Sequence, residues 1–103
     1  MKIDILKSET VTVEGRKQTD TKTIYQPWCE IKDLYSKEIY EALQIGLENV
    51  IAFEVRYCDV IKKMWHDLKS YTIACDGITY KPYEIRYANK SKTKVLIKAS
   101  MID

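Results

Sequence analysis

The sequence predicts a mainly β domain of the α+β class. We expect either a small open β-barrel or a two-layer antiparallel sheet of five or six strands, with an inserted α-helix at about 36–46. Three observations predict this class. Apolar and polar side chains alternate along several short stretches, as they do in half-buried strands. The spacing becomes helical over 36–46 and again over 60–69, and an Asp-Gly dipeptide separates two alternating runs as in a tight hairpin. The 103 residues suit a single domain, 1–103.

The first third of the chain is expected to contain two strands and a long loop. Valines alternate with threonines over 9–13 and predict a strand. Residues 14–23 include Gly15 and contain no apolar side chain, so they predict a flexible polar loop. Residues 24–32 are the next strand candidate, in which Pro27 indicates an edge position or a bulge.

The segment 36–46 has the periodicity of an amphipathic helix. Ile39, Leu43 and Gly46 fall on one face. Ser36 can cap the first turn through its hydroxyl, and Gly46 stands where a left-handed residue would end the helix.

The next two segments are a strand and a second helical stretch. Over 49–57, Phe53 and Val55 share one face with other apolar residues, so this is the clearest strand and is expected to be central in the sheet. Over 60–69 the apolar spacing predicts a short second helix, and a long connection packed over the sheet is the alternative.

The last third of the chain is expected to form three strands. The Asp-Gly dipeptide between the runs 71–75 and 78–87 suits the positive φ angles of a two-residue type I′ turn. A turn at 89–92 then leads to a final strand over 95–99. Lysines gather in this region and indicate a solvated strand face and turn: Lys81, Lys90, Lys92, Lys94 and Lys98.

Composition narrows the class of protein. The net charge of +2 is too small to indicate a dedicated nucleic-acid binder. Three widely spaced cysteines without a C-x-x-C pair argue against a disulfide framework, and they predict small buried side chains in a reducing cytoplasm. No apolar run is long enough to cross a bilayer, and the N-terminus lacks the shape of a signal peptide, so we expect no membrane association.

No catalytic, cofactor-binding or metal-binding site is expected. His66 is the single histidine, and it cannot supply a metal ligand set with three scattered cysteines. A Cys–His nucleophilic pair is formally possible, but no neighbouring Gly-rich turn prepares an oxyanion site. We therefore expect a non-enzymatic module that binds through its surface. Eight tyrosines against one phenylalanine fit an interface protein, and they equally fit the strand propensity of tyrosine.

Five short motifs follow one another along 11–99. They are Trp28-Cys29-Glu30-Ile31 in a strand, Ser36-Lys37-Glu38-Ile39-Tyr40-Glu41-Ala42 at the start of the helix, Phe53-Glu54-Val55-Arg56-Tyr57 in a strand that ends in Arg-Tyr, Asp76-Gly77-Ile78-Thr79-Tyr80 in the hairpin, and the hydrophobic final strand. In order and spacing they resemble the head–tail joining proteins of tailed bacteriophages, also called head-closure or stopper proteins. Two features depart from that pattern. Ser36 stands where the family has glycine, and the stretch 58–70 is longer than usual and carries Trp65.

The resemblance implies a structural virion protein of a siphovirus-like phage or prophage. Such proteins assemble as a homo-oligomeric ring, a dodecamer on the portal, which closes the head after DNA packaging and offers a docking surface to the tail. The implied partners are further copies of the chain, the portal or adaptor protein, a tail-terminator or tail-completion protein and, transiently, packaged DNA. The implied location is the head–tail interface of the virion, after assembly in the host cytoplasm.

The resemblance also assigns expected roles to residues. The predicted loop would face the channel or a neighbouring subunit through Arg16, Lys17, Gln18, Thr19, Asp20 and Lys22. Tyr40 and Lys94 are candidate interface residues. Seven residues are expected to define the fold as core, sheet or hairpin residues: Trp28, Phe53, Arg56, Tyr57, Asp76, Gly77 and Tyr80.

Other functions stay open at this point. A small β-barrel that binds nucleic acid would use aromatic strands and Lys-rich loops, although 15 acidic residues dilute the lysines here. Another tail-completion protein of the virion is a second alternative. A small enzyme is a third, and its turnover would vanish on substitution of a single cysteine or of His66.

Overall fold

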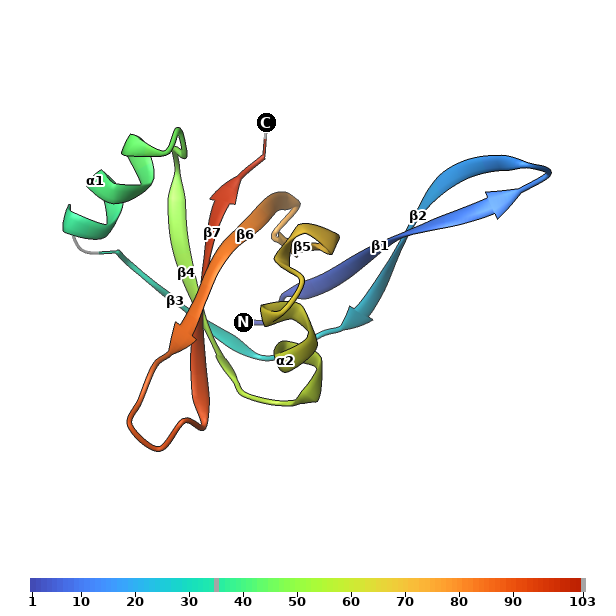
Figure 1. Cartoon of the computed structure of the whole chain (residues 1–103). Coiled ribbons are helices and arrows are strands. Elements are labelled where there is room, and N and C mark those ends of the chain that lie inside the picture. Colours follow the sequence, from blue (N-terminus) through green and yellow to red (C-terminus); the bar gives the residue numbers. More distant parts are fainter. Residues whose placement is uncertain (35, 103) are drawn as a thin grey trace.

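The computed structural model describes residues 1–34 and 36–102 (Figure 1). Over these residues the chain forms seven antiparallel strands in one open sheet, in the order β2-β1-β5-β6-β7-β4-β3, with two α-helices and one 3-10 turn. The predicted mainly β class is confirmed, although the strands number seven rather than five or six. The elements are β1 (Asp4–Val13), β2 (Arg16–Tyr25), β3 (Cys29–Lys32), α1 (Ser36–Gln44), β4 (Val50–Arg56), α2 (Asp59–Trp65), η1 (Leu68–Ser70), β5 (Tyr71–Cys75), β6 (Ile78–Tyr87) and β7 (Lys94–Met101).

The predicted polar loop at 14–23 is wrong, because most of it is the strand β2. β2 pairs with β1 as far as Val13 and Arg16, and the turn between them consists of Glu14 and Gly15. These two residues have φ angles of 52° and 79°, as a type I′ turn requires. The lack of apolar residues misled the prediction, since a ribbon exposed on both faces needs no apolar alternation. Its β-branched threonines favour extended backbone instead.

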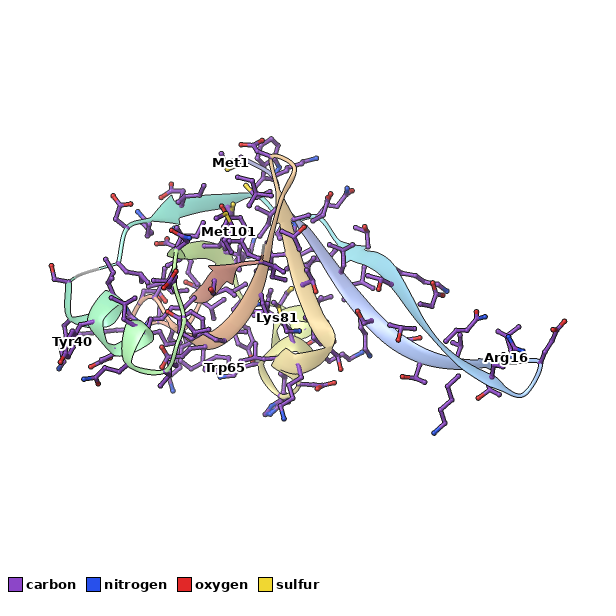
Figure 2. All side chains as sticks on the ribbon, turned by 90° about the horizontal axis from the view of Figure 1, so that it is seen from above. Met1, Arg16, Tyr40, Trp65, Lys81 and Met101 are labelled. Carbon is purple, nitrogen blue, oxygen red and sulfur yellow. The ribbon has the colours of Figure 1, made fainter. Side chains whose placement is uncertain are left out.

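The far part of this hairpin projects from the rest of the molecule (Figures 1 and 2). β5 pairs with β1 only as far as Lys7, so beyond that point β1 has β2 as its single neighbour. We call residues 8–22 the arm. The arm gives the molecule its elongated shape, with extents of 48 × 30 × 25 Å.

The hydrophobic core lies between the sheet and α2. Ile61 and Met64 of α2 are fully buried together with Phe53 and Ile97 of the sheet. The prediction of a short helix within 60–69 is therefore confirmed, and η1 continues it. The apolar residues of this segment have helical spacing because one face of α2 packs against the sheet.

The strand predicted to be central lies near one edge. β4 forms as expected, but only β3 separates it from the edge, whereas β6 occupies the middle of the order. The short strand β3 begins at Cys29, later than predicted, after Pro27. Lys2 and Trp28 form an isolated bridge that ties the beginning of the chain to the segment before β3.

The helix α1 begins at Ser36 as predicted and ends at Gln44, two residues before the predicted end. Gly46 has a φ of 83°, and the Leu47 N–H donates to the Ala42 carbonyl at 2.9 Å, so the helix ends in a left-handed residue as predicted. Ser36 is the first helical residue rather than the residue before the helix. Only Ala42 of α1 is buried, so the apolar face of this helix is not covered by the sheet.

The predicted hairpin at Asp76-Gly77 is confirmed. The two residues have φ angles of 50° and 76°, and they join β5 to β6 with Cys75 opposite Ile78. β6 then shifts register after Pro82, where proline cannot donate a ladder hydrogen bond.

Replacing Gly77 by alanine is expected to lower the free energy of unfolding by about 1–2 kcal/mol, because a Cβ disfavours the left-handed conformation. Nothing lies within 4 Å of the position that this Cβ would take, so the effect arises from the backbone alone. Gly77→Asn should cost less, since asparagine adopts that conformation more readily. Urea unfolding of both variants measures this difference. Equal losses in the two would contradict the backbone explanation.

Candidate interaction surfaces

The residues predicted to contact a partner from 14–23 lie on the outer strand of the arm. β2 is the edge strand of the sheet, and Arg16 through Ile24 are all exposed. The six predicted residues are therefore brought together, although in a strand and not in a loop. An edge strand leaves every second N–H and C=O without a partner within its sheet, so it offers these groups to another chain.

The two faces of the arm differ in chemistry. One face carries hydroxyls, with Ser8 Oγ and Thr21 Oγ1 3.2 Å apart across the ribbon. On the other face like charges stand opposite each other: Lys7 opposes Lys22, and Glu9 opposes Asp20. Like charges directly opposite destabilise a strand pair.

Ion pairs along each strand of the hairpin, one of them from Lys7 at the base of the arm, partly offset this repulsion. Lys7 lies 3.8 Å from Glu9, and Lys22 lies 3.7 Å from Asp20. All four side chains are substantially exposed, so each pair contributes less than about 1 kcal/mol. A two-stranded ribbon without a hydrophobic face is marginal on its own. The arm is therefore a segment that a partner would stabilise.

The second surface is the uncovered face of α1 with the residue after it. Four large apolar side chains are exposed there by 41–69%, and we call them the α1 patch: Ile39, Tyr40, Leu43 and Ile45. Tyr40, predicted as an interface residue, lies within it. Exposed apolar side chains gathered in this way mark interaction sites. Acidic residues border the patch, among them Glu41 and Glu48, both exposed.

An ion-pair network holds α1 against the sheet. Lys98 Nζ of β7 lies 2.7 Å from Glu84 of β6 and 3.2 Å from Glu38 of α1. Arg86 reaches the same Glu38 carboxylate at 3.2 Å. Burial alone would lower the pKa of Lys98, but the hydrogen bonds to Glu84 and Glu38 raise it above the usual value. Lys98 is only 7% exposed, so its assignment to a solvated lysine face was wrong.

Lys81 was also predicted to lie on the solvated lysine face, but it is half-buried. Its Nζ donates hydrogen bonds to the carbonyls of Lys69 at 2.5 Å and Tyr71 at 2.7 Å. Burial lowers the pKa of this ammonium. Lys81 thereby ties β6 to η1 and to the start of β5, which is a structural role.

The sequence predicted that Trp28 is a fold-defining residue of the core or the sheet, but its ring lies outside the core. Its side chain is 69% exposed, and Lys2 Nζ lies 5.0 Å from its ring centroid. It lines a shallow cleft of about 360 Å³ with Met1, Arg56 and Lys94. Lys94, predicted as an interface residue, is exposed here and lies 3.7 Å from Glu54. Arg56 is exposed, and the ion pairs of Glu54 are made by Lys32 and Lys94.

Three other residues predicted to define the fold lie in the core or pack against it. Phe53 is fully buried, and the half-buried ring of Tyr80 meets it edge-on with centroids 5.3 Å apart. Tyr57 belongs to an aromatic cluster with Trp65 and Tyr87. The sequence did not reveal this cluster, because its members lie in three separate elements without a shared periodicity.

The described residues contain no group of three or more His, Cys, Asp or Glu side chains that could hold a metal ion. His66 is exposed at the end of α2. Burial raises the pKa of the Cys29 and Cys75 thiols, so neither is an activated thiolate. Within 1–34 and 36–102 no helix is long and apolar enough to cross a membrane.

No family model matches the chain, and no curated protein matches it.

Proposed function

We propose that this chain is a structural protein of a tailed bacteriophage or prophage that forms a ring under the portal or adaptor, closes the filled head and docks the tail. The order of the five motifs and a mainly β fold with an inserted helix support this proposal. The observation that carries it is the placement of two unpartnered surfaces, the arm and the α1 patch, at opposite ends of the molecule. Arg16 and Tyr40 mark these ends in Figure 2.

A ring needs two different faces on each subunit, because its contacts are head-to-tail. The end of the arm presents Arg16 and Lys17, both exposed, close to the exposed Val13. The α1 patch presents apolar side chains bordered by Glu41 and Glu48. The two surfaces are thus complementary in charge, and each has apolar area to bury.

The proposed ring places the other partners around it. The portal or adaptor protein lies on one side, and a tail-terminator or tail-completion protein lies on the other. Packaged DNA contacts the ring transiently in the channel. In this proposal the protein acts by shape and assembly, without catalysis, at the head–tail interface of the virion.

Charge reversal at either surface is expected to weaken self-association, and reversal at both is expected to restore it. The first variant is Arg16→Glu with Lys17→Glu, and the second is Glu41→Lys with Glu48→Lys. Each should weaken assembly about 10-fold or more, because like charges then meet at the contact. Light scattering during size-exclusion chromatography, over a range of protein concentrations at low salt, measures the assembly size. Reversal of Lys62 and Lys63 on α2 is the matched control and should leave that size unchanged.

The location of this protein in the phage particle needs a separate measurement. We expect mass spectrometry of purified tailed particles to give as many copies of this chain as of the portal protein. Filled heads without tails should already contain it if it closes the head. Its presence on free tails alone would favour the tail-completion function, and its absence from all particles would overturn the virion proposal.

A further inference from the structure

Three aromatic rings from three elements converge beside α2. Tyr57 follows β4, Trp65 ends α2 and Tyr87 ends β6. The Trp65 and Tyr87 centroids lie 4.9 Å apart at an interplanar angle of 66°, and those of Tyr57 and Tyr87 lie 5.6 Å apart at 33°. The three rings line an open pocket of about 400 Å³, together with Lys62 and His66.

The rings of this aromatic pocket are only partly used by the core. Tyr57 and Trp65 are half-buried and pack against the core, whereas Tyr87 is 38% exposed and lies outside it. The Trp65 ring is steeply inclined to both tyrosine rings, at 63° and 66°, so the three rings form a corner whose walls are π-faces and ring edges. The volume falls within the range of small-ligand sites. Such a corner suits a flat aromatic ring that stacks on one wall.

Positive charge gathers around the same pocket. Lys62 lines it, and the turn that follows β6 carries Lys90 and Lys92. Lys92 Nζ lies 5.5 Å from the Tyr87 ring centroid, which brings one of these charges directly to the pocket.

The turn that carries Lys90 and Lys92 is held in place. Asn89 Oδ1 accepts hydrogen bonds from the N–H of Thr93 at 3.1 Å and of Lys94 at 3.4 Å. The Thr93 carbonyl in turn accepts the Tyr57 N–H at 2.9 Å. The basic turn and the aromatic rings thus form one preorganised unit, although they come from distant parts of the sequence.

We propose that this aromatic pocket binds a base of single-stranded nucleic acid. The base stacks against Tyr87 and Trp65, while Lys62, Lys90 and Lys92 contact the flanking phosphates. Stacking on aromatic side chains inside a positive groove is how proteins hold single strands without sequence readout. Bases of a duplex are already stacked and cannot enter the pocket, so a duplex would meet the lysines alone.

Fluorescence titration of the full chain tests this proposal. In a Trp28→Phe background Trp65 is the single tryptophan, and the replaced Trp28 is exposed. We expect an oligothymidylate to quench Trp65 saturably at low salt, and a duplex of equal length to bind more weakly with little quenching. The single-strand affinity should fall with salt because counterions are released from the phosphates.

Two variants separate stacking from charge. Tyr87→Leu should weaken single-strand binding about 10-fold, as expected for the loss of one stacked ring. Lys92→Gln should weaken it and also flatten the salt dependence, since one phosphate contact is lost. The matched control is Lys37→Gln on α1, which should change neither quantity.

Three outcomes would overturn the proposal. Absence of quenching, or equal binding of duplex and single strand, would show that no base enters the pocket; this comparison needs no variant and holds even where Tyr87→Leu does not fold. A folded Tyr87→Leu protein with unchanged affinity would assign binding to the lysines alone. Neither Tyr87 nor Lys92 belongs to the arm or to the α1 patch, so a failure of base binding and a failure of ring assembly can be distinguished.

Discussion

Replacing Phe53 by alanine is expected to lower the free energy of unfolding by about 3–5 kcal/mol, the largest effect of any single substitution considered for this chain. Phe53 is 0% exposed, and its Cα neighbours across β4 are Ile31 on β3 and Ile97 on β7. Its ring also meets Tyr80 edge-on at 5.3 Å. Removal of the ring therefore loses its burial and leaves a cavity among side chains from three other strands.

This loss is large against the whole stability of a small domain, which is about 5–15 kcal/mol. Phe53→Leu should cost less, about 1–2 kcal/mol, because most of the buried volume is kept. Urea unfolding followed by circular dichroism gives both values. A Phe53→Ala loss below about 1 kcal/mol would mean that the core is not packed around this ring.

Replacing Lys98 by methionine is expected to lower the free energy of unfolding by about 2–3 kcal/mol at neutral pH. Methionine keeps the side-chain volume but removes the charge that joins Glu38 to Glu84. Glu38 then keeps Arg86 as a partner, whereas Glu84 is half exposed and can be hydrated, so the loss stays below that of a fully buried pair. Adding Glu38→Gln and Glu84→Gln should recover much of the loss, since no carboxylate is then left without its cation.

The matched control for this substitution is Lys94→Met. Lys94 also pairs with a glutamate, but its side chain is 57% exposed and the distance to Glu54 is 3.7 Å. The control should cost less than about 1 kcal/mol, as exposed pairs do. If Lys98→Met were as stable as the original chain at pH 7, the ion-pair network would make no net contribution to the free energy of unfolding.

The pKa of Lys98 also sets the direction of a pH effect. Because the pKa is raised in the folded chain, the stabilisation is fully present below the unfolded lysine value of about 10.4 and is lost as pH rises through the folded value. Burial first, and the neighbouring Tyr87 second, raise the pKa of Tyr57, which favours unfolding at alkaline pH as well. The effect of Lys98 is therefore measured as the difference in the free energy of unfolding between the original chain and Lys98→Met. This difference should shrink above about pH 10.5.

The Lys98 network also bears on the proposed assembly. α1 buries only Ala42, so the ion pairs of Glu38 with Lys98 and Arg86 are a principal tie between this helix and the sheet. The orientation of the α1 patch, one of the two proposed ring surfaces, depends on that tie. Loss of Lys98 should therefore weaken assembly as well as folding.

Local chemistry made most elements predictable. The helix ending at Gly46, the hairpin at Asp76-Gly77 and the strand containing Phe53 each depend on a periodicity or on a residue that adopts a positive φ, and such signals act within a few residues. The short helix with Ile61 and Met64 was predictable for the same reason, because its spacing already distinguishes a covered face.

The surfaces proposed to function were less predictable. The threonine-rich strand β2 was mistaken for a loop, since exposed ribbons lack the apolar alternation on which the prediction depended. Trp28 was expected in the core, but its ring is exposed. Its backbone forms a bridge with Lys2 that holds the segment before β3 in place.

By itself, the sequence determined the mainly β class, the tight turns, the two helices and the residues able to fill a core, because these follow from side-chain periodicity and from backbone preferences of single residues. Only the tertiary structure decided the strand order, the projection of the arm, the exposure of the α1 patch, the burial of Lys98 and the meeting of Tyr57, Trp65 and Tyr87. Those features arise from pairings between distant segments, and no local pattern encodes which distant partner a strand or a side chain will meet.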